Sequence, residues 1–469
     1  MSVLGQLKAE KMAKIGLISL GCAKNLVDSE IMLGTLRDAG HELVDEPESA
    51  ELLIINTCSF INDAKKESIE AIQEAAERRN GGRRQRLLVA GCLAQRYAAK
   101  LPALMPEVDA FIGLDQVAKV ADIVDSLLAE DRVEGAAPEN HVSERSAYIP
   151  DFSTPHQRLT PRHSSFVKIA EGCNHFCSFC IIPHIRGRHR SRTSADIIRE
   201  ARELIAGGCR EINLVSQDST FFGMDRWEGA RPGPRSLVDS GRGESLASLL
   251  RELNSIEGDF WIRVLYTHPA HWSEELMDTF AACDKVVKYV DVPLQHVADG
   301  VLKAMRRETD GAHVRGLVRT LRERIPGVCI RSTFIVGFPG ETQADFDELM
   351  AFIREAGFER GGVFEYSREE DTRAYELGGR VHSSTRRKRR NLSTELLFNV
   401  ASERGETLVG QRIRVLVEAP GVARSQWDAP DVDGYVEVPR ELPVGAFAEV
   451  LVQDAVGYQL FAEGAGRES

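Results

Sequence analysis

Short apolar runs alternate with amphipathic stretches over the first part of the chain. Buried strands are predicted at 14–21, 51–57 and 86–91, and helices at 28–39 and 64–79, because apolar side chains recur there at strand or helix spacing. Strands that alternate with helices predict a parallel sheet covered by helices. We therefore expect an N-terminal α/β domain over residues 13–128.

The alternation resumes after residues 129–162, a stretch rich in Pro, Ser, His and charge that is typical of a linker. Later strands are predicted at 166–170, 211–216, 261–266, 289–293, 330–337 and 361–366. About six β/α units predict an open barrel over 163–400 rather than a closed eightfold one. Short β-rich runs after that domain predict a small all-β barrel over 405–465.

Composition places the chain among ordinary globular proteins, with 43% hydrophobic and 28% charged residues. The first residues lack the apolar core of a signal peptide, and no stretch has the length and apolarity of a membrane span. We therefore expect a cytoplasmic protein without a membrane partner, in a compartment that keeps thiols reduced. Nine cysteines in that setting indicate metal binding or catalysis rather than disulfides. The net charge of −12 argues against a protein that binds nucleic acid with its whole surface.

Three cysteines, Cys173, Cys177 and Cys180, follow one another in a C-x3-C-x2-C spacing. Three thiolates on one loop can bind three irons of a 4Fe–4S cluster. The missing fourth cysteine leaves one iron open to another ligand. A zinc site is the alternative, with His175 or His184 as fourth ligand, although zinc patterns usually space their ligands differently.

A second set of cysteines, Cys22, Cys58 and Cys92, follows the three strands predicted in the N-terminal domain. The carboxyl ends of parallel strands share one edge of a sheet, so these thiols can converge in space. A second cluster with three cysteine ligands is therefore predicted. Buried structural thiols are the alternative, since a free cysteine behaves as a small hydrophobe. The remaining cysteines, Cys209, Cys283 and Cys329, do not share this context and are predicted to be structural.

Together these residues resemble the methylthiotransferase family of radical S-adenosylmethionine (SAM) enzymes, over about residues 15–463. The resemblance implies three domains: an N-terminal methylthiotransferase α/β domain with an auxiliary cluster, a radical-SAM (β/α)6 partial TIM barrel and a C-terminal TRAM barrel. It implies two 4Fe–4S clusters, with Cys22, Cys58 and Cys92 as ligands of the auxiliary one and Cys173, Cys177 and Cys180 as ligands of the one that binds SAM. It also implies that Phe179 places backbone near the adenine of SAM, although an ordinary packing role is the alternative.

Several motifs are similar to the RimO-type branch of this family, which acts on ribosomal protein twelve of the small subunit. They are Ser19-Leu-Gly-Cys-Ala-Lys-Asn25, Ser216-Gln-Asp218, Pro293-Leu-Gln-His296 and the segment from Arg424 to Gly434. A departure is Ser191-Arg-Thr193, where a proline usually follows the arginine. The C-terminal residues 405–469 include 11 Asp and Glu but only 5 Arg and no Lys. Such a barrel suits a basic protein better than RNA. The alternatives are a merely solvated acidic surface and a contact of the basic run 386–390 with ribosomal RNA.

The resemblance implies that a methylthio group replaces hydrogen on the β-carbon of an aspartate. SAM bound at one cluster would yield a 5′-deoxyadenosyl radical, and the auxiliary cluster would carry the sulfur. The implied partners are ribosomal protein twelve, either free or within the ribosomal subunit, and a reductant protein such as flavodoxin or ferredoxin. Two alternatives stay open: a MiaB-type enzyme acting on a tRNA adenosine, and a non-catalytic iron–sulfur protein that binds RNA or the ribosome.

Overall fold

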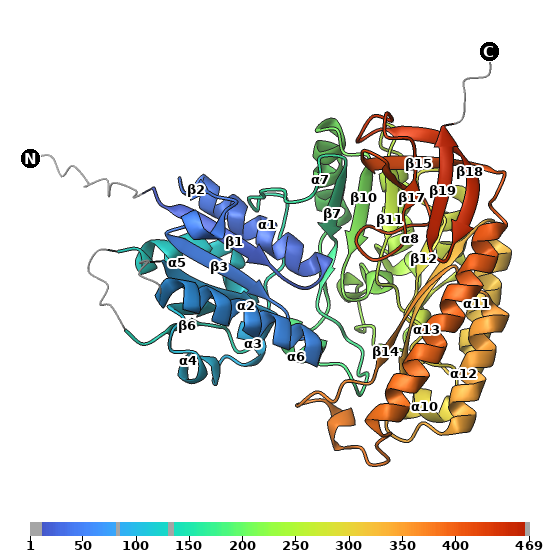
Figure 1. Ribbon diagram of the computed structural model, residues 1–469, viewed down its shortest axis with the longest axis horizontal. Coiled ribbons are helices and arrows are strands. Elements are labelled where there is room, and N and C mark those ends of the chain that lie inside the picture. Colours follow the sequence, from blue (N-terminus) through green and yellow to red (C-terminus); the bar gives the residue numbers. More distant parts are fainter. Residues whose placement is uncertain (1–11, 81–84, 130–135, 465–469) are drawn as a thin grey trace, which may run out of the picture. The chain divides into compact units, whose positions relative to one another are not determined.

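The computed structural model of this protein describes residues 12–80, 85–129 and 136–464 (Figure 1). These residues form two compact units: one contains the chain up to Leu159 together with Ile181–Arg188, and the other contains Thr160–Cys180 and everything from His189. Within the described ranges, no helix is long and apolar enough to cross a membrane. The leading segment, which was considered for a signal peptide, lies outside the described residues.

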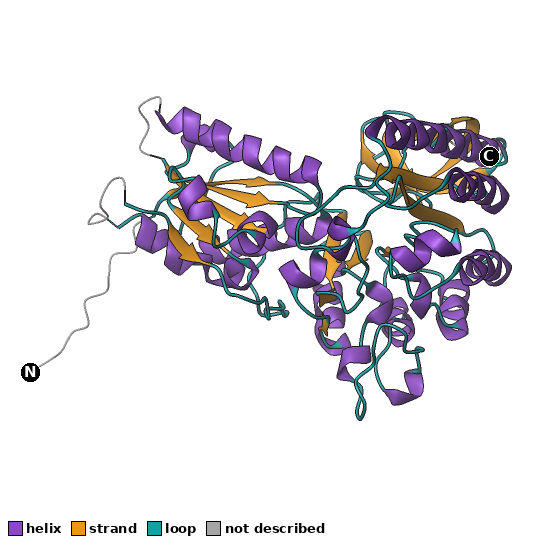
Figure 2. Ribbon diagram, turned by 90° about the horizontal axis from the view of Figure 1, so that it is seen from below, coloured by secondary structure: helices purple, strands orange, loops and turns teal. Residues whose placement is uncertain are grey.

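The first unit is built on a six-stranded parallel sheet in the order β2-β1-β3-β4-β5-β6. Its strands are β1 (Lys14–Ser19), β2 (Glu42–Leu43), β3 (Leu52–Thr57), β4 (Arg86–Gly91), β5 (Ala110–Ile112) and β6 (Glu139–His141). Every residue of β3 is buried, as expected for a central parallel strand covered on both faces. Helices lie on both faces of this sheet (Figure 2).

Helices or 3₁₀ turns separate successive strands of the first unit, as the alternating pattern predicts, and the later segment Ile181–Arg188 adds one more helix. The helices are α1 (Ala23–Asp38), α2 (Asn62–Asn80), α3 (Cys92–Arg96), α4 (Leu101–Leu104), α5 (Val120–Leu127) and, in that later segment, α6 (Ile182–Arg186), with short 3₁₀ turns at η1 (Pro47–Ser49) and η2 (Leu114–Lys119). The three strands predicted from sequence are confirmed within two residues, but the helix predicted at 28–39 begins five residues earlier, directly after Cys22.

Part of the stretch predicted as a linker, 129–162, is folded into the first unit. Strand β6 pairs with β5 at the sheet edge, and the backbone N–H of Gln157 donates to Glu30 O. Residues 130–135 of this stretch lie outside the described residues. The polar composition that suggested a linker reflects an edge strand and a surface segment packed along α1.

The second unit contains six parallel strands that form two sheets, β11-β10-β7 and β12-β13-β14. They are β7 (Ser164–Lys168), β10 (Glu211–Val215), β11 (Trp261–Val264), β12 (Tyr289–Asp291), β13 (Cys329–Val336) and β14 (Arg360–Glu365), while β8 (Ala170–Glu171) and β9 (Arg190–Ser191) form a separate antiparallel pair. A bridge between Ile262 and Val286 continues the curve from one sheet to the other. The predicted open barrel of six β/α units is therefore confirmed.

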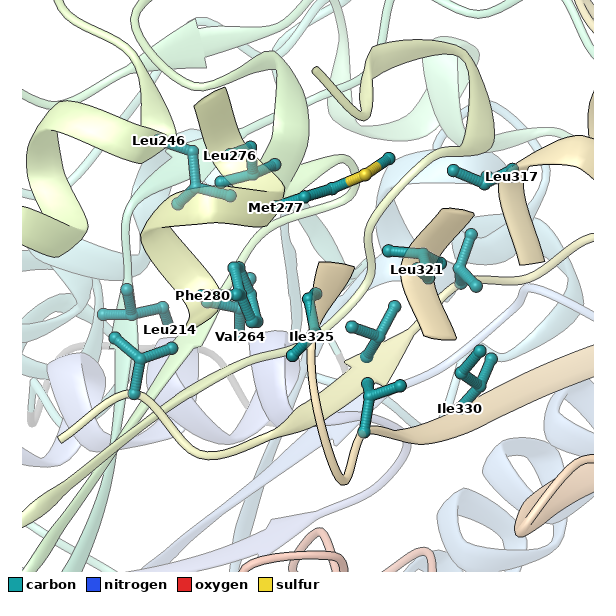
Figure 3. Close-up of a cluster of buried hydrophobic side chains, with 14 of the residues drawn as sticks. Leu214, Leu246, Val264, Leu276, Met277, Phe280, Leu317, Leu321, Ile325 and Ile330 are labelled. Carbon is teal, nitrogen blue, oxygen red and sulfur yellow. The ribbon is translucent and has the colours of Figure 1, made fainter. Parts of the chain in front are cut away.

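Helices connect these strands. They are α7 (Ser194–Ala206), α8 (Leu246–Asn254), α9 (Glu274–Ala282), α10 (Asp299–Ala304), α11 (Gly311–Arg324), α12 (Gln343–Ala356) and α13 (Ser383–Glu406), with 3₁₀ turns η3 (Ser219–Phe221), η4 (Met224–Arg226), η5 (Ser240–Arg242), η6 (Pro269–His271) and η7 (Arg373–Glu376). Polar side chains fix several helix starts; for example, Thr342 and Asp345 form a capping box at α12. Apolar side chains of α9 and α11 pack against those of the strands, as in the part of the core that Figure 3 draws.

The last segment of the second unit is a closed barrel in the order β15-β16-β17-β19-β18. Its strands are β15 (Arg412–Ala419), β16 (Val422–Ser425), β17 (Val436–Glu437), β18 (Phe447–Val456) and β19 (Gln459–Gly464). Inward side chains such as Val415, Val436 and Val450 are fully buried. The small all-β barrel predicted from the C-terminal composition is confirmed.

Buried ion pairs join this barrel to the amino ends of the parallel strands. Glu211, the first residue of β10, contacts both Arg263 of β11 and Arg424 of the C-terminal barrel. Nearby, Arg360 pairs with Asp428, and further along the edge Arg331 and Tyr289 contact Asp433. The C-terminal barrel is thus fixed to the end of the open barrel opposite the carboxyl ends of its strands.

Candidate metal centres and active site

The cysteine loop of the second unit leaves the carboxyl end of the open barrel. It follows β7 and β8 and begins at Gly172, whose backbone φ is +82°. The N–H of Gly172 donates to Gln217 Oε1 at 2.7 Å, and the N–H of Ser178 donates to Met305 O at 2.8 Å. Segments following β10 and α10 therefore fix the loop at both ends.

The three thiols of this loop lie near one another. Burial raises the pKa of Cys173 well above its usual value, and the charges of Asp218, Cys180 and Cys177 raise it further. The N–H of Cys180 donates to Cys177 O at 3.2 Å. All three cysteines are only half-buried.

The spacing of the thiols argues against a single zinc ion. Tetrahedral zinc with bonds of about 2.3 Å to sulfur brings its ligand atoms within roughly 3.8 Å of one another. Among the residues that the structure describes, groups close enough to surround one ion are His175 with His268 and His271, and Cys177 with His268 and Glu308. Neither group contains three cysteines. The three thiols of the loop therefore do not form a group close enough to surround one ion.

His175, the proposed fourth ligand for zinc, is engaged elsewhere. Its Nε2 lies 2.8 Å from Asp218 Oδ2, and its Nδ1 lies 3.1 Å from Glu308 Oε1. Burial opposes protonation of this imidazole, but the bonds to Asp218 and Glu308 raise its pKa to about 10. The other candidate, His184, is exposed. The sequence alternative of a Cys3His zinc site therefore gains no support from His175.

A buried network of histidines and carboxylates surrounds His175. Asp218 also accepts from His271 Nδ1 at 3.1 Å, and the ring of His268 stacks on that of His175 with centroids 3.6 Å apart. These histidines follow β11 in the run Thr267-His-Pro-Ala-His271, and Asp218 follows β10. The network holds the cysteine loop against two strand ends.

Sequence reasoning did not find most of this network. Asp218 was noticed only within a branch motif, and His268, His271 and Glu308 were not considered. A signal was present, because two histidines three residues apart directly follow a predicted strand. A cleft of about 1110 Å³ adjoins the network and is lined by Phe176 of the cysteine loop and by Glu308 among others.

Phe179 lies within an aromatic cluster beside the loop. Its ring meets Phe338 edge-on, with centroids 6.4 Å apart, and Phe338 in turn packs against Tyr366. Phe338 belongs to the turn that closes β13. Phe179 therefore has the packing role that sequence analysis left as an alternative, and a part in binding adenine stays a prediction.

The second trio of cysteines lies at the carboxyl edge of the sheet in the first unit. Cys22 follows β1, and Cys58 and Cys92 directly follow β3 and β4, which are neighbours in the sheet. The Cα of Gly21 lies so close to Cys58 that a Cβ there would be 3.2 Å from its Sγ. The convergence predicted from strand ends is thus present in the fold.

The electrostatic surroundings of this trio are mixed. Burial raises the pKa of Cys92 to about 12 and raises that of Cys58 as well. Burial also acts to raise the pKa of Cys22, but the positive charges of Lys24 and Arg186 bring that pKa below its usual value. These cations favour the thiolate form of Cys22, which is the form that binds a metal. The site fits an iron–sulfur cluster by donor type and charge.

The other three cysteines have packing roles in the second unit. Cys209 and Cys329 contact backbone carbonyls through Sγ, at Glu211 O and Trp427 O respectively. Cys283 is buried at the end of α9. None of the three belongs to either trio, in agreement with the structural role predicted for them.

Gly91, which precedes Cys92, is required for the geometry of the N-terminal trio. Its φ is +93°, and a Cβ would lie 2.7 Å from Thr57 O and closer still to Asn56 Oδ1. Gly91→Ala is expected to lower the free energy of unfolding of the first unit by about 2–4 kcal/mol, through strain and overpacking. Differential scanning calorimetry would measure this change. Gly410→Ala is the control, because its φ is +81° but nothing lies within 4 Å; equal losses in both variants would contradict the packing argument.

Comparisons with known families match each region of the chain. Residues 14–113 match the family described as "Uncharacterized protein family UPF0004", residues 167–353 match "Radical SAM superfamily", and residues 409–464 match "TRAM domain". Among solved structures, the radical S-adenosylmethionine methyltransferase TsrM from Kitasatospora setae is similar in fold, with a TM-score of 0.55 and 16% identity. That likeness covers 90% of this chain and 80% of the other.

Curated relatives are similar over nearly the whole chain. Ribosomal protein uS12 methylthiotransferase RimO of Akkermansia muciniphila is 56% identical over 452 residues, covering 96% of this chain and 99% of the relative. The protein of the same name from Opitutus terrae is 56% identical over 455 residues, covering 96% of each. The branch predicted from the motifs is therefore confirmed. The chain belongs to the RimO family of radical-SAM methylthiotransferases.

Proposed function

We propose that this protein replaces a hydrogen on the β-carbon of an aspartate in ribosomal protein uS12 with a methylthio group. The relatives that share 56% identity carry a name with this substrate. The observation that carries the proposal is the presence of two cysteine trios, each at carboxyl ends of parallel strands and each in its own domain. One trio serves SAM cleavage and the other serves sulfur transfer.

The proposed ligands are the six cysteines of the two trios, with three for each 4Fe–4S cluster. When bound, the cluster at the loop supplies the electron that cleaves SAM, and the auxiliary cluster supplies the sulfur. The chain's own contribution is placement. The Gly172 and Ser178 hydrogen bonds hold the loop, and the His175–Asp218 contact orients it. Phe179, which packs against Phe338, is proposed to place its backbone near the adenine of SAM.

The C-terminal barrel supports a basic protein as the substrate. Some of its carboxylates face the open barrel, where Asp428 and Asp433 pair with arginines. Glu437, Glu441, Glu449 and Asp454 are exposed. These carboxylates present negative charge, which attracts basic protein surface and repels phosphate. A reductant protein such as flavodoxin or ferredoxin and a cytoplasmic location, where thiols stay reduced, complete the proposal.

Anaerobically reconstituted protein, incubated with SAM, a reductant, small ribosomal subunits and bulk tRNA, would test this function. Mass spectrometry is expected to find a methylthio group in place of hydrogen on an aspartate of uS12. A gain on tRNA would instead mean a MiaB-type substrate. Absence of SAM cleavage would favour a non-catalytic iron–sulfur protein. Ribosomal subunits incubated without SAM are the control.

A further inference from the structure

The segment Ile181–Arg188 links the two cysteine trios along the chain. It begins directly after Cys180, the last cysteine of the loop that carries Cys173, Cys177 and Cys180 (the SAM loop), yet it belongs to the first unit. Ile181 and Ile185 are buried in one apolar cluster with Cys92 and Leu114. The helix α6 begins directly after Ile181, contains Ile185 and ends at Arg186, before Gly187 with its positive φ of 74°. The apolar anchors thus deliver Arg186 to the auxiliary cysteines.

Arg186 contacts the auxiliary site directly. Its side chain is 2% exposed, and Nη2 lies 3.4 Å from Cys92 Sγ. The same nitrogen donates to Asn25 Oδ1 and lies 3.1 Å from Asp28 Oδ2. Asn25 in turn donates to Leu20 O and Thr57 O, which precede Cys22 and Cys58. The guanidinium is therefore tied to the backbone that carries all three thiols.

The charge of Arg186 suits a bound anion at this site. A buried cation is costly unless it is compensated. Asp28 is a buried partner for Arg186, and Lys24 is a second, nearly buried cation beside Cys22. Three thiolates with a cluster form a group of net negative charge. Guanidinium is well suited to such a site, because it is always charged and donates in a fixed fork.

We propose that Arg186 is the counter-cation of the auxiliary cluster, so that the segment after the SAM loop completes the sulfur-carrying site. This inference rests on the proposed function, because it requires a cluster at Cys22, Cys58 and Cys92. Arg186 is a positioning residue: it orients Asn25 and Cys92 and stabilises negative charge on the cluster. A nearby cation favours the reduced, more negative form and therefore raises the reduction potential.

The experiment uses full-length protein in which Cys173, Cys177 and Cys180 are replaced with Ala, so that only the auxiliary cluster remains. Iron and sulfide per chain and the midpoint potential from an EPR-monitored redox titration are measured. Arg186→Gln is expected to lower the potential and to speed loss of iron to a chelator. The potential and the rate of iron loss of Arg186→Lys should lie between those of the parent and the Gln variant, because lysine keeps the charge but not the planar set of guanidinium donors. Arg188→Gln, on an exposed position of the same segment, should match the parent.

A second variant acts in the opposite direction and does not remove the buried cation. Asp28→Asn removes a negative charge beside Arg186 and should raise the potential. An unchanged potential in both Arg186→Gln and Asp28→Asn would overturn the role of Arg186 while leaving the auxiliary cluster in place. If Arg186→Gln does not fold, the Asp28→Asn and Arg186→Lys potentials decide. A parent without any cluster would overturn the auxiliary site itself, and the role of Arg186 with it.

Discussion

Cys58→Ala is expected to abolish methylthio transfer while SAM cleavage continues, whereas Cys177→Ala abolishes both. The reason is that the two thiols belong to different trios in different domains. Cys177 lies on the loop at the carboxyl end of the open barrel, and Cys58 follows β3 of the N-terminal sheet. Each variant should also lose about half of the iron, because each removes one of the three cysteine ligands proposed for its cluster.

Two products separate these outcomes. Chromatography of 5′-deoxyadenosine reports SAM cleavage, and mass spectrometry of uS12 reports transfer of the methylthio group. Cys283→Ala is the matched control, since Cys283 is buried at the end of α9 and belongs to neither trio. It should retain both products and the full iron content. Transfer by Cys58→Ala protein would show that the assignment of two separate clusters is wrong.

Much of the site was predictable because its residues mark the ends of regular elements. Cys58 and Cys92 each directly follow an apolar run that reads as a strand, and parallel strands bring such ends together. The spacing of Cys173, Cys177 and Cys180 is local, so no tertiary information is needed to group them. The six-strand barrel follows from the same alternation of strand and helix patterns.

The contacts that tune the site were not predictable in the same way. Arg186 follows the SAM loop in sequence, but its side chain lies against Cys92, which is far away in the chain. Only the folded structure shows this contact. His271 and Glu308 are ordinary polar residues until the fold places them around His175 and Asp218. Side-chain pairing across distant segments depends on tertiary packing, which periodicity does not encode.

The acidic excess of the C-terminal barrel shows the same limit. Its carboxylates were interpreted together as a surface property, yet Asp428 is 1% exposed and pairs with Arg360. The segment from Arg424 to Gly434, noted as a branch motif, supplies these inward contacts. A segment that resembles a branch-specific motif thus also fixes the C-terminal barrel to the strands of the open barrel.

Glu211→Gln is expected to destabilise the second unit by about 3–5 kcal/mol, because it leaves two buried guanidinium groups without their shared carboxylate. Glu211 and Arg263 are fully buried, and Arg263 Nε lies 2.9 Å from Glu211 Oε1. Arg424 of the C-terminal barrel contacts the other oxygen of the same carboxylate. Urea unfolding would measure the loss, and Glu437→Gln, on the exposed surface of the barrel, should change stability little.

The same carboxylate predicts how stability depends on pH. Burial would raise the pKa of Glu211, but the charges of Arg424 and Arg263 lower it from 4.5 to about 2. A lowered pKa in the folded state stabilises the protein fully above about pH 4.5, and this stabilisation is lost as the pH falls towards 2. The difference in unfolding free energy between the parent and Glu211→Gln should therefore stay constant from pH 7 to 5 and shrink below pH 4.5. A difference that grows with acid would mean that Glu211 is protonated in the folded protein, and that the two arginines are held by other partners.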